Sequence, residues 1–125
     1  MRREDGFTII SVLVAIVMLS VGILALSHSG AQAMAAQTLA GNRSTALAIG
    51  RAYMETVRSR RPDQVQSESP IKVDATGTAS PNGAFTRSVE VKVVRHNLKE
   101  IRVIVEFPRS KVPVELVTLA YLGNF

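Results

Sequence analysis

The chain begins with a short charged segment, Met1 to Gly6, and continues into a long segment without charge. From Phe7 to Asn42 there is no Asp, Glu, Lys or Arg, and His28 is the only titratable side chain. The most apolar part, about residues 7–27, would span about 30 Å as an α-helix, which is the thickness of a bilayer hydrocarbon core. The pattern therefore predicts a membrane-spanning helix at the N-terminus.

The helical pattern continues beyond this apolar segment. Residues 31–40 are rich in Ala, Gln, Met and Leu, which favour helix, and no proline occurs before Pro62. An apolar stripe then recurs mostly at steps of three and four residues; its members are Leu39, Ala46, Leu47, Gly50, Met54 and Val57. We predict one helix of about 55 residues that Pro62 ends, with residues 30–61 outside the membrane.

The second half of the chain reads as a loop followed by strands. Residues 62–83 are punctuated by Pro and Gly and predict a surface loop, with a short strand at residues 71–73. Residues 84–122 alternate between apolar and polar positions and predict about three antiparallel strands, with turns near residues 96–99 and 108–111. In the last strand the alternation changes face near Val117, which predicts a bulge. The expected fold is α+β, with the sheet packed on the helix stripe.

Composition limits the chain to one small domain. Of 125 residues, about 65 remain for a soluble head beyond the helix. The absence of cysteine excludes a disulfide framework and a thiolate metal site. His28 falls at the membrane edge and His96 in a predicted turn, and neither is spaced with carboxylates as metal ligands would be. We expect no catalytic residues, no cofactor and no metal, and hence no enzyme.

The order of charge, glycine and apolar run at the start is diagnostic. A cleavable secretory signal places its small-residue cleavage site after the apolar core, whereas here Gly6 precedes it. The run Gly6-Phe7-Thr8-Ile9-Ile10-Ser11-Val12-Leu13-Val14-Ala15 resembles the class III signal of type IV prepilins and type II secretion pseudopilins. The alternative is an ordinary uncleaved signal anchor. Arg2 and Arg3 before the apolar run place residues 1–6 in the cytoplasm and the chain after about residue 28 outside the inner membrane.

The resemblance implies how the chain is processed and where it acts. It implies a leader of residues 1–6, cleavage by a prepilin peptidase between Gly6 and Phe7, and N-methylation of Phe7. Residues 7–29 would form the transmembrane and filament-core helix, and residues 30–125 a globular pilin head most like that of V-type minor pilins and I-type pseudopilins. The implied partners are other pilins or pseudopilins, the peptidase, an inner-membrane assembly platform and membrane lipid. The filament would be a type IV pilus or a type II secretion pseudopilus.

One position departs from the family pattern. The fifth residue of the mature chain, usually a glutamate thought to pair with a neighbour's N-terminal amine, is Ser11. A hydroxyl brings no charge to such a contact, and charge-assisted hydrogen bonds are the stronger ones. We therefore expect a minor subunit rather than one that stacks repeatedly on itself.

The net charge of +5 raises a second hypothesis. Arg58, Arg60 and Arg61, together with Lys72, could form a patch for an anionic partner such as DNA or a surface, as in an uptake or adhesion pilus. The alternative is that the arginines are solvated and compensate the negative end of the helix dipole.

Overall fold

The computed structural model describes residues 3–123, with side chains from residue 8 onward. The first element is α1 (Arg3–Arg58), followed by a 3-10 turn η1 (Pro62–Gln64) and the strands β1 (Glu68–Val73), β2 (Phe85–Arg95), β3 (Leu98–Glu106) and β4 (Val114–Tyr121). The chain divides into two compact units. We call Met1–Thr38 the stem unit and Leu39–Phe125 the head unit.

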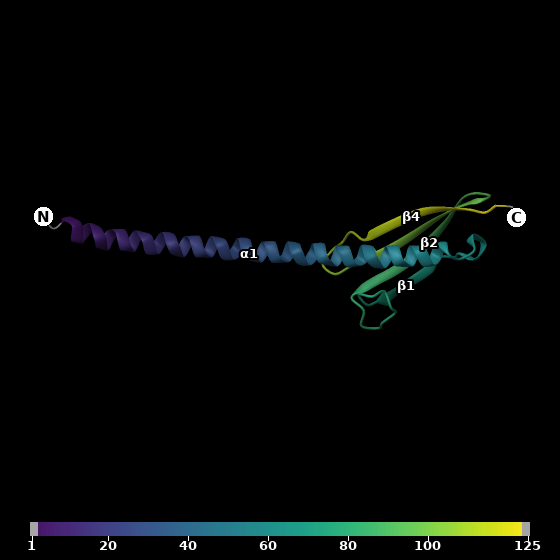
Figure 1. Cartoon of the computed structure of the whole chain (residues 1–125), viewed down its shortest axis with the longest axis horizontal. Helices are drawn as coiled ribbons and strands as arrows, with labels where there is room; N and C mark the ends of the chain where they lie inside the picture. Colours follow the sequence, from purple (N-terminus) through teal and green to yellow (C-terminus); the bar gives the residue numbers. More distant parts are fainter. Residues whose placement is uncertain (1–2, 124–125) are drawn as a thin grey trace. The chain divides into compact units, whose positions relative to one another are not determined.

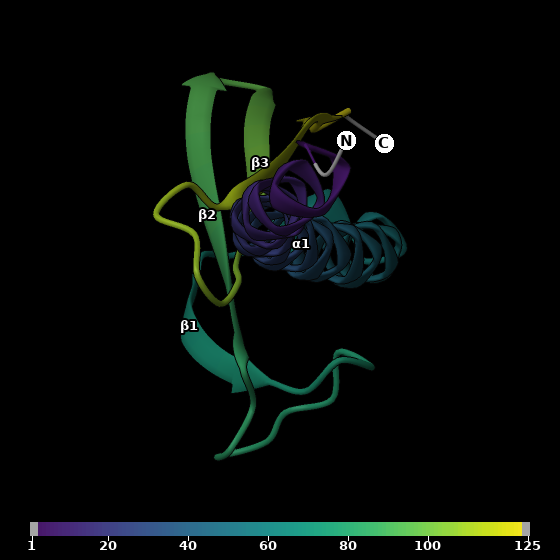
Figure 2. The same ribbon diagram turned by 90° about the vertical axis from the view of Figure 1, so that its left-hand side faces the viewer.

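The head unit has the predicted α+β architecture. Its four strands form one antiparallel sheet in the order β1-β2-β3-β4, and the second part of α1 lies along one face of that sheet (Figures 1 and 2). The sequence indicated about three strands and a short one at residues 71–73. The structure makes that short strand a full member of the sheet, because β1 begins at Glu68 and pairs with β2.

The bulge predicted in the last strand is wrong. β4 pairs with β3 in one unbroken register, from Val105 opposite Val114 to Leu98 opposite Tyr121. The alternation seemed to change face because the outward positions of β4 are apolar as well, so both faces of the strand carry apolar side chains. The register shifts of the sheet lie elsewhere, between Val93 and Arg95 in β2 and between Glu68 and Ile71 in β1.

The core of the head unit lies between α1 and the sheet. Ala46, Ile49, Met54 and Val57 of α1 are buried, and so are the inward positions of the strands. The strand members of the core are Val73, Phe85, Val89, Ile101, Val103 and Val105. Each fully buried side chain of this size contributes about 1.5–3 kcal/mol. Of the predicted stripe, Leu39 and Leu47 remain partly exposed, whereas Ile49, outside the stripe, is buried.

The helix ends three residues before the predicted end at residue 61. The N–H of Arg60 bonds to the carbonyl of Val57, which tightens the last turn, and Arg61 has extended backbone angles (φ −66°, ψ 132°). The cause is Pro62, because its ring disfavours helical geometry in the residue before it.

The loop between β1 and β2 folds back on β1. The Asp74 carboxylate accepts hydrogen bonds from the Thr76 hydroxyl, at 2.6 Å, and from the N–H groups of Thr76 and Thr78. These bonds, the Thr76 hydroxyl bond first, lower the pKa of Asp74. Further along the loop, Ala79 bridges to Val73, and the Ser80 N–H bonds to the carbonyl of Lys72 at 3.0 Å. The outer edge of β1 is therefore partly covered by its own loop.

Candidate functional site

The predicted processing site lies at the start of α1. Gly6 and Phe7 have helical backbone, but side chains are described only from Thr8 onward. Met1 and Arg2 lie outside the described residues. Immediately after them, every large apolar side chain from Ile9 to Leu26 is exposed. By length and composition, α1 could cross a membrane. An apolar surface of this length needs lipid or protein around it.

Ser11 differs from Ser20 and Ser27 of the stem unit in its hydrogen bonding. The hydroxyls of Ser20 and Ser27 each donate to the carbonyl four residues earlier, both at 2.8 Å. For the half-buried Ser11, no hydrogen-bond partner occurs within the described part of the chain. The position usually occupied by a glutamate thus carries a small neutral polar group on an otherwise apolar surface.

The arginines of the predicted anionic-partner patch each face a carboxylate. Arg58 lies 3.6 Å from Glu55, and Arg61 lies 3.6 Å from Asp63. Arg60 contacts Glu68 at 2.9 Å. Lys72 of β1 is the one member without an acidic partner among the residues that the structure describes. The positive charge available to a ligand is therefore smaller than the sequence indicates.

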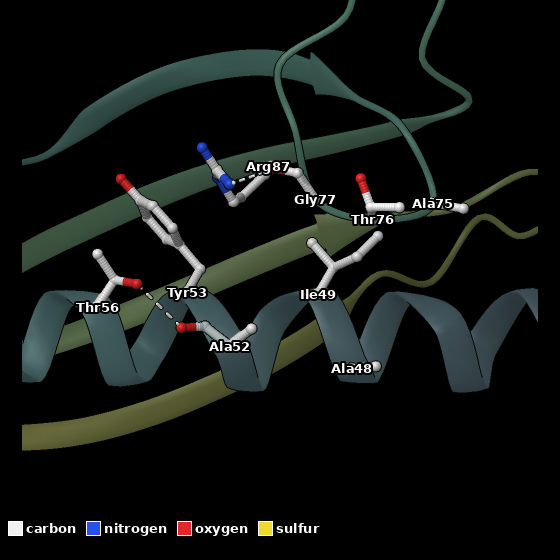
Figure 3. A pocket seen from close by; sticks show the side chains of 9 residues that line it. All are labelled: Ala48, Ile49, Ala52, Tyr53, Thr56, Ala75, Thr76, Gly77 and Arg87. Atoms are coloured by element: carbon white, nitrogen blue, oxygen red, sulfur yellow. Dashed lines mark hydrogen bonds between the residues drawn. The ribbon is translucent and has the colours of Figure 1, made fainter.

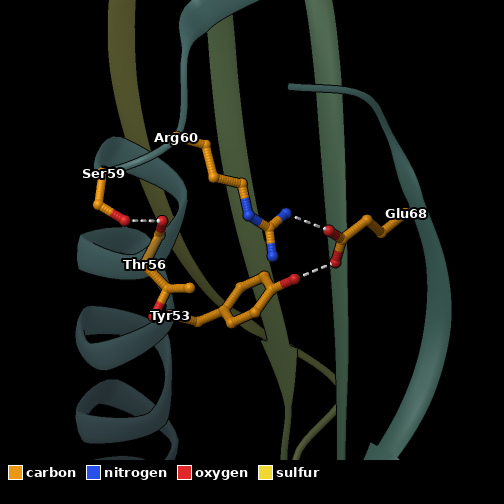
Figure 4. Close-up of polar contacts among 5 residues, drawn as sticks. All are labelled: Tyr53, Thr56, Ser59, Arg60 and Glu68. Carbon is orange, nitrogen blue, oxygen red and sulfur yellow. Dashed lines mark hydrogen bonds and ion pairs between the residues drawn. The ribbon is translucent and has the colours of Figure 1, made fainter. Parts of the chain in front are cut away.

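A polar cluster that the sequence did not reveal joins α1 to the sheet. The Tyr53 hydroxyl donates to one Glu68 oxygen, and the Arg60 guanidinium donates to the other at 2.9 Å (Figure 4). Arg87 of β2 stacks on the Tyr53 ring, with its guanidinium carbon 3.7 Å from the ring centroid. Such a stacked cation contributes about 0.5–1 kcal/mol when exposed and more when desolvated. The contacts fasten the last turns of α1 to β1 and β2.

The charges in this cluster shift the pKa values of its members. Partial burial raises the pKa of Tyr53, and the hydrogen bond to Glu68 raises it further. Burial alone would also raise the pKa of Glu68, but hydrogen bonds from Tyr53 and Arg60, with the charges of Arg60 and Arg87, bring it below its ordinary value. The hydrogen bond to Glu68 raises the pKa of Arg60. At neutral pH the cluster thus holds an ionised carboxylate, a neutral phenol and two cations.

Beside this cluster is a small cavity of about 240 Å³. Arg87 lines it and donates to the carbonyl of Gly77 at 3.1 Å, and the Thr56 hydroxyl donates to the carbonyl of Ala52 (Figure 3). The rest of the lining consists of small or apolar side chains and Tyr53. No carboxylate or imidazole lines the cavity, so it offers no base for a nucleophile.

The two histidines lie apart from any such arrangement. His28 contacts Gln32 on the same helix at 3.1 Å, and His96 is exposed at the turn between β2 and β3. Among the described residues there is no group of His, Cys, Asp and Glu that could hold a metal ion.

Residues 1–27 match the family model described as the prokaryotic N-terminal methylation motif. This is the signal motif of type IV prepilins and pseudopilins. The match covers the charged start, Gly6 and the apolar part of the stem unit, and it confirms the resemblance drawn from the sequence. This motif is typical of pilin-like proteins that are processed as prepilins, anchored in the membrane and assembled with other pilins. No significant match was found among curated proteins or among solved structures.

Tyr53, Glu68 and Arg87 are the residues that sequence reasoning missed. Tyr53 carries a polar tip beside the apolar stripe of α1, and such a tip seeks a partner when partly buried. That was the one available signal. Glu68 and Arg87 lie in polar surroundings, and nothing local distinguishes them from solvated charges.

Proposed function

We propose that the chain is a minor pilin-like structural subunit, cut by a prepilin peptidase between Gly6 and Phe7 and assembled into a type IV pilus. One observation carries the proposal: the methylation motif covers residues 1–27, and within it the helix leaves every large apolar side chain from Ile9 to Leu26 exposed. Cutting after Gly6 would remove the charged leader and leave that apolar helix on the mature protein. N-methylation would then fall on the new amine of Phe7.

The proposed orientation follows from the basic residues. Arg2 and Arg3 precede the apolar run, and the next basic residue is Arg43. Because positive residues prefer the cytoplasmic side, the leader would face the peptidase in the cytoplasm. Residues 7–29 would span the inner membrane, and the head, from residue 30, would lie outside it.

Assembly would transfer the apolar helix from lipid to other helices. Lipid and apolar side chains are similarly nonpolar, so the transfer has little hydrophobic driving force, and packing between helices supplies most of the gain. The inner-membrane assembly platform would extract the subunit, and other pilins would surround its stem. The exposed apolar side chains would then stay out of water at every stage.

Ser11 supports a minor position in the filament. A glutamate at this place would contribute a charge-assisted contact to a neighbouring amine in a low-dielectric surrounding. The Ser11 hydroxyl is shorter and neutral, so the same contact would be weaker. A subunit used once or a few times per filament can lack it, whereas a subunit that forms the shaft would lose it at every repeat.

A type II secretion pseudopilus uses the same signal and the same kind of helix. The filament from which the chain is recovered decides between pilus and pseudopilus. In either case the proposed role is structural, because proteins that carry this motif are structural rather than catalytic.

The proposal is tested by processing of the full chain. Co-expression with a prepilin peptidase should shorten the chain by the six leader residues, and Gly6→Val should block that shortening because a branched side chain hinders the cut backbone. Gly6→Ala, which adds a single methyl group, is the matched control and should retain most processing. Equal shortening of the parent and of Gly6→Val would contradict cleavage at this bond.

A further inference from the structure

The two edges of the sheet are protected unequally. On the β1 side, Pro70 has no N–H to offer, and the register with β2 shifts between Glu68 and Ile71. Ala79 and Ser80 of the loop also bond to this edge. Proline, irregular pairing and a covering loop are the usual means by which proteins block an edge strand.

The β4 edge has none of these protections. β4 contains no proline or basic residue, and Glu115 is its only charge. Within the described part of the chain, no backbone hydrogen bond reaches its outer edge, so alternate residues point N–H and C=O groups outward unpaired. Its face away from α1 carries Val117, Leu119 and Tyr121, which are 53%, 60% and 65% exposed. A regular apolar edge of this kind is a template for another strand.

A groove lies between this edge and α1. Its volume is about 350 Å³, and its walls are Arg51, Met54, Glu55 and Arg58 on α1 and Leu116, Val117 and Thr118 on β4. Glu55 pairs with Arg58 at 3.6 Å, whereas Arg51 has no acidic partner among the described residues. The wall therefore carries excess positive charge and favours a segment with an acidic side chain directed toward α1.

The direction of β4 limits which segment can bind. Val114, at its start, shares a groove with Leu39 and Leu47, and Ala120, near its end, shares one with Val57 and Arg58. β4 therefore runs beside α1 in the same direction. Two copies joined by antiparallel β4–β4 pairing would have opposed α1 helices, which subunits anchored from one side of one membrane cannot adopt.

Parallel β4–β4 pairing of two copies would be a closed two-fold contact with the α1 helices on opposite faces, whereas a helical filament grows by heterologous contacts. A second copy with its α1 in the same direction and on the same face of the joined sheet would have to present β1. That edge is blocked by Pro70 and by the loop at Ala79 and Ser80. We infer that the β4 edge binds an extended segment of a different pilin-class subunit by β-strand addition, with an acidic side chain facing Arg51 and apolar side chains beside Val117 and Leu119. This inference rests on the proposed function, since the partner is another subunit of the same filament.

Site-specific photo-crosslinking in the full chain tests the inference. A benzoylphenylalanine placed at Leu119, in cells that carry the complete filament system, should form an adduct with a second polypeptide that has its own charged leader and apolar helix. The adduct should map to an extended segment with an acidic residue. Val93, on the β2–β3 hairpin, is the matched control, because it is 63% exposed against 60% for Leu119. It should give little adduct.

Three outcomes would overturn the inference: an adduct with a second copy of this chain, equal yields at Leu119 and Val93, or adducts only with lipid. Absence of an adduct at Leu119 from chains that are recovered processed in filaments would overturn it as well. If the chain is never processed at Phe7, the proposed function fails instead, and the two failures are thus distinguishable.

The charge of the groove has its own test. Arg51→Glu should lower the yield of the Leu119 adduct about fivefold. This is the effect expected from losing a partly exposed ion pair of the stronger kind. Arg43→Glu makes the same change at an exposed position of α1 outside this groove and should leave the yield unchanged. When the partner's mapped acidic residue is also changed to Arg, the Arg51→Glu variant should again form the Leu119 adduct. Equal effects of the two arginine variants would refute the role of Arg51.

Discussion

Glu68→Gln should destabilise the head unit, because Glu68 is the acceptor that joins Tyr53 of α1 and Arg60 to β1. The side chains of Arg60 and Glu68 are 43% and 36% exposed, so solvent screens the ion pair and limits it to at most about 1 kcal/mol. The Tyr53 hydrogen bond to Glu68 is only partly buried and adds about 1 kcal/mol. Glutamine keeps the shape and one acceptor oxygen. We expect a loss of about 1 kcal/mol in unfolding free energy, or about 4–8 °C in Tm for a unit of this size.

This loss should depend on pH in one direction. The folded-state pKa of Glu68 is lowered, so its contribution is present above the ordinary carboxyl pKa of about 4.3 and disappears as the pH falls through the folded value. The difference in unfolding free energy between the parent and Glu68→Gln should therefore be largest at neutral pH and should disappear in acid. The pKa of Tyr53 is raised, so its contribution is present below about 10 and is lost as the pH rises through the folded value.

The assay is urea unfolding of the full chain in a non-ionic detergent, followed by near-ultraviolet circular dichroism of the tyrosines. The parent and Glu68→Gln are compared at neutral pH and at about pH 3. Glu106→Gln, at the exposed end of β3, is the control for removal of a carboxylate and should change little. A difference that is absent at neutral pH, or that persists unchanged in acid, would refute the reasoning.

Two further substitutions test the head and the stem. Gly83→Ala should lower the unfolding free energy by about 2–3 kcal/mol in the same urea assay, because a Cβ there would overlap the backbone of Val73. Gly41→Ala is the control: its Cβ would meet open space, and the change should stabilise α1 by up to about 1 kcal/mol. Equal effects of the two substitutions would contradict the packing at Val73. Ser11→Glu should raise the amount of chain in sheared filaments without changing the folded head, because a carboxylate gains more than a hydroxyl beside an amine in a dry core, less the cost of taking up a proton in the bilayer. Equal amounts of parent and variant on quantitative immunoblots would leave Ser11 as a packing residue.

The stem and its signal could be predicted from the sequence because their physics is local. The absence of charge between Phe7 and Asn42, and the placement of Gly6 before the apolar run, are properties of consecutive residues. β3 was equally readable, since Ile101, Val103 and Val105 alternate strictly and are all buried. In each case one stretch of chain contains the whole pattern.

Contacts between distant segments could not be predicted in the same way. Tyr53 meets Glu68 and Arg87 only because the sheet brings β1 and β2 beside the end of α1. The acidic partner of Arg60 likewise depends on that fold. The predicted bulge in β4 was wrong because its outward residues are apolar. A strand whose outer face binds another protein has the same apolar sequence pattern as a strand that is buried on both faces.

The central claim is that the chain acts as a processed subunit inside a filament. The most direct measurement is mass spectrometry of the N-terminal peptide of this chain, taken from sheared and purified filaments. The account predicts a peptide that begins at Phe7 and carries one N-terminal methyl group. A peptide that begins at an intact Met1, in chain recovered from the filaments, would contradict it.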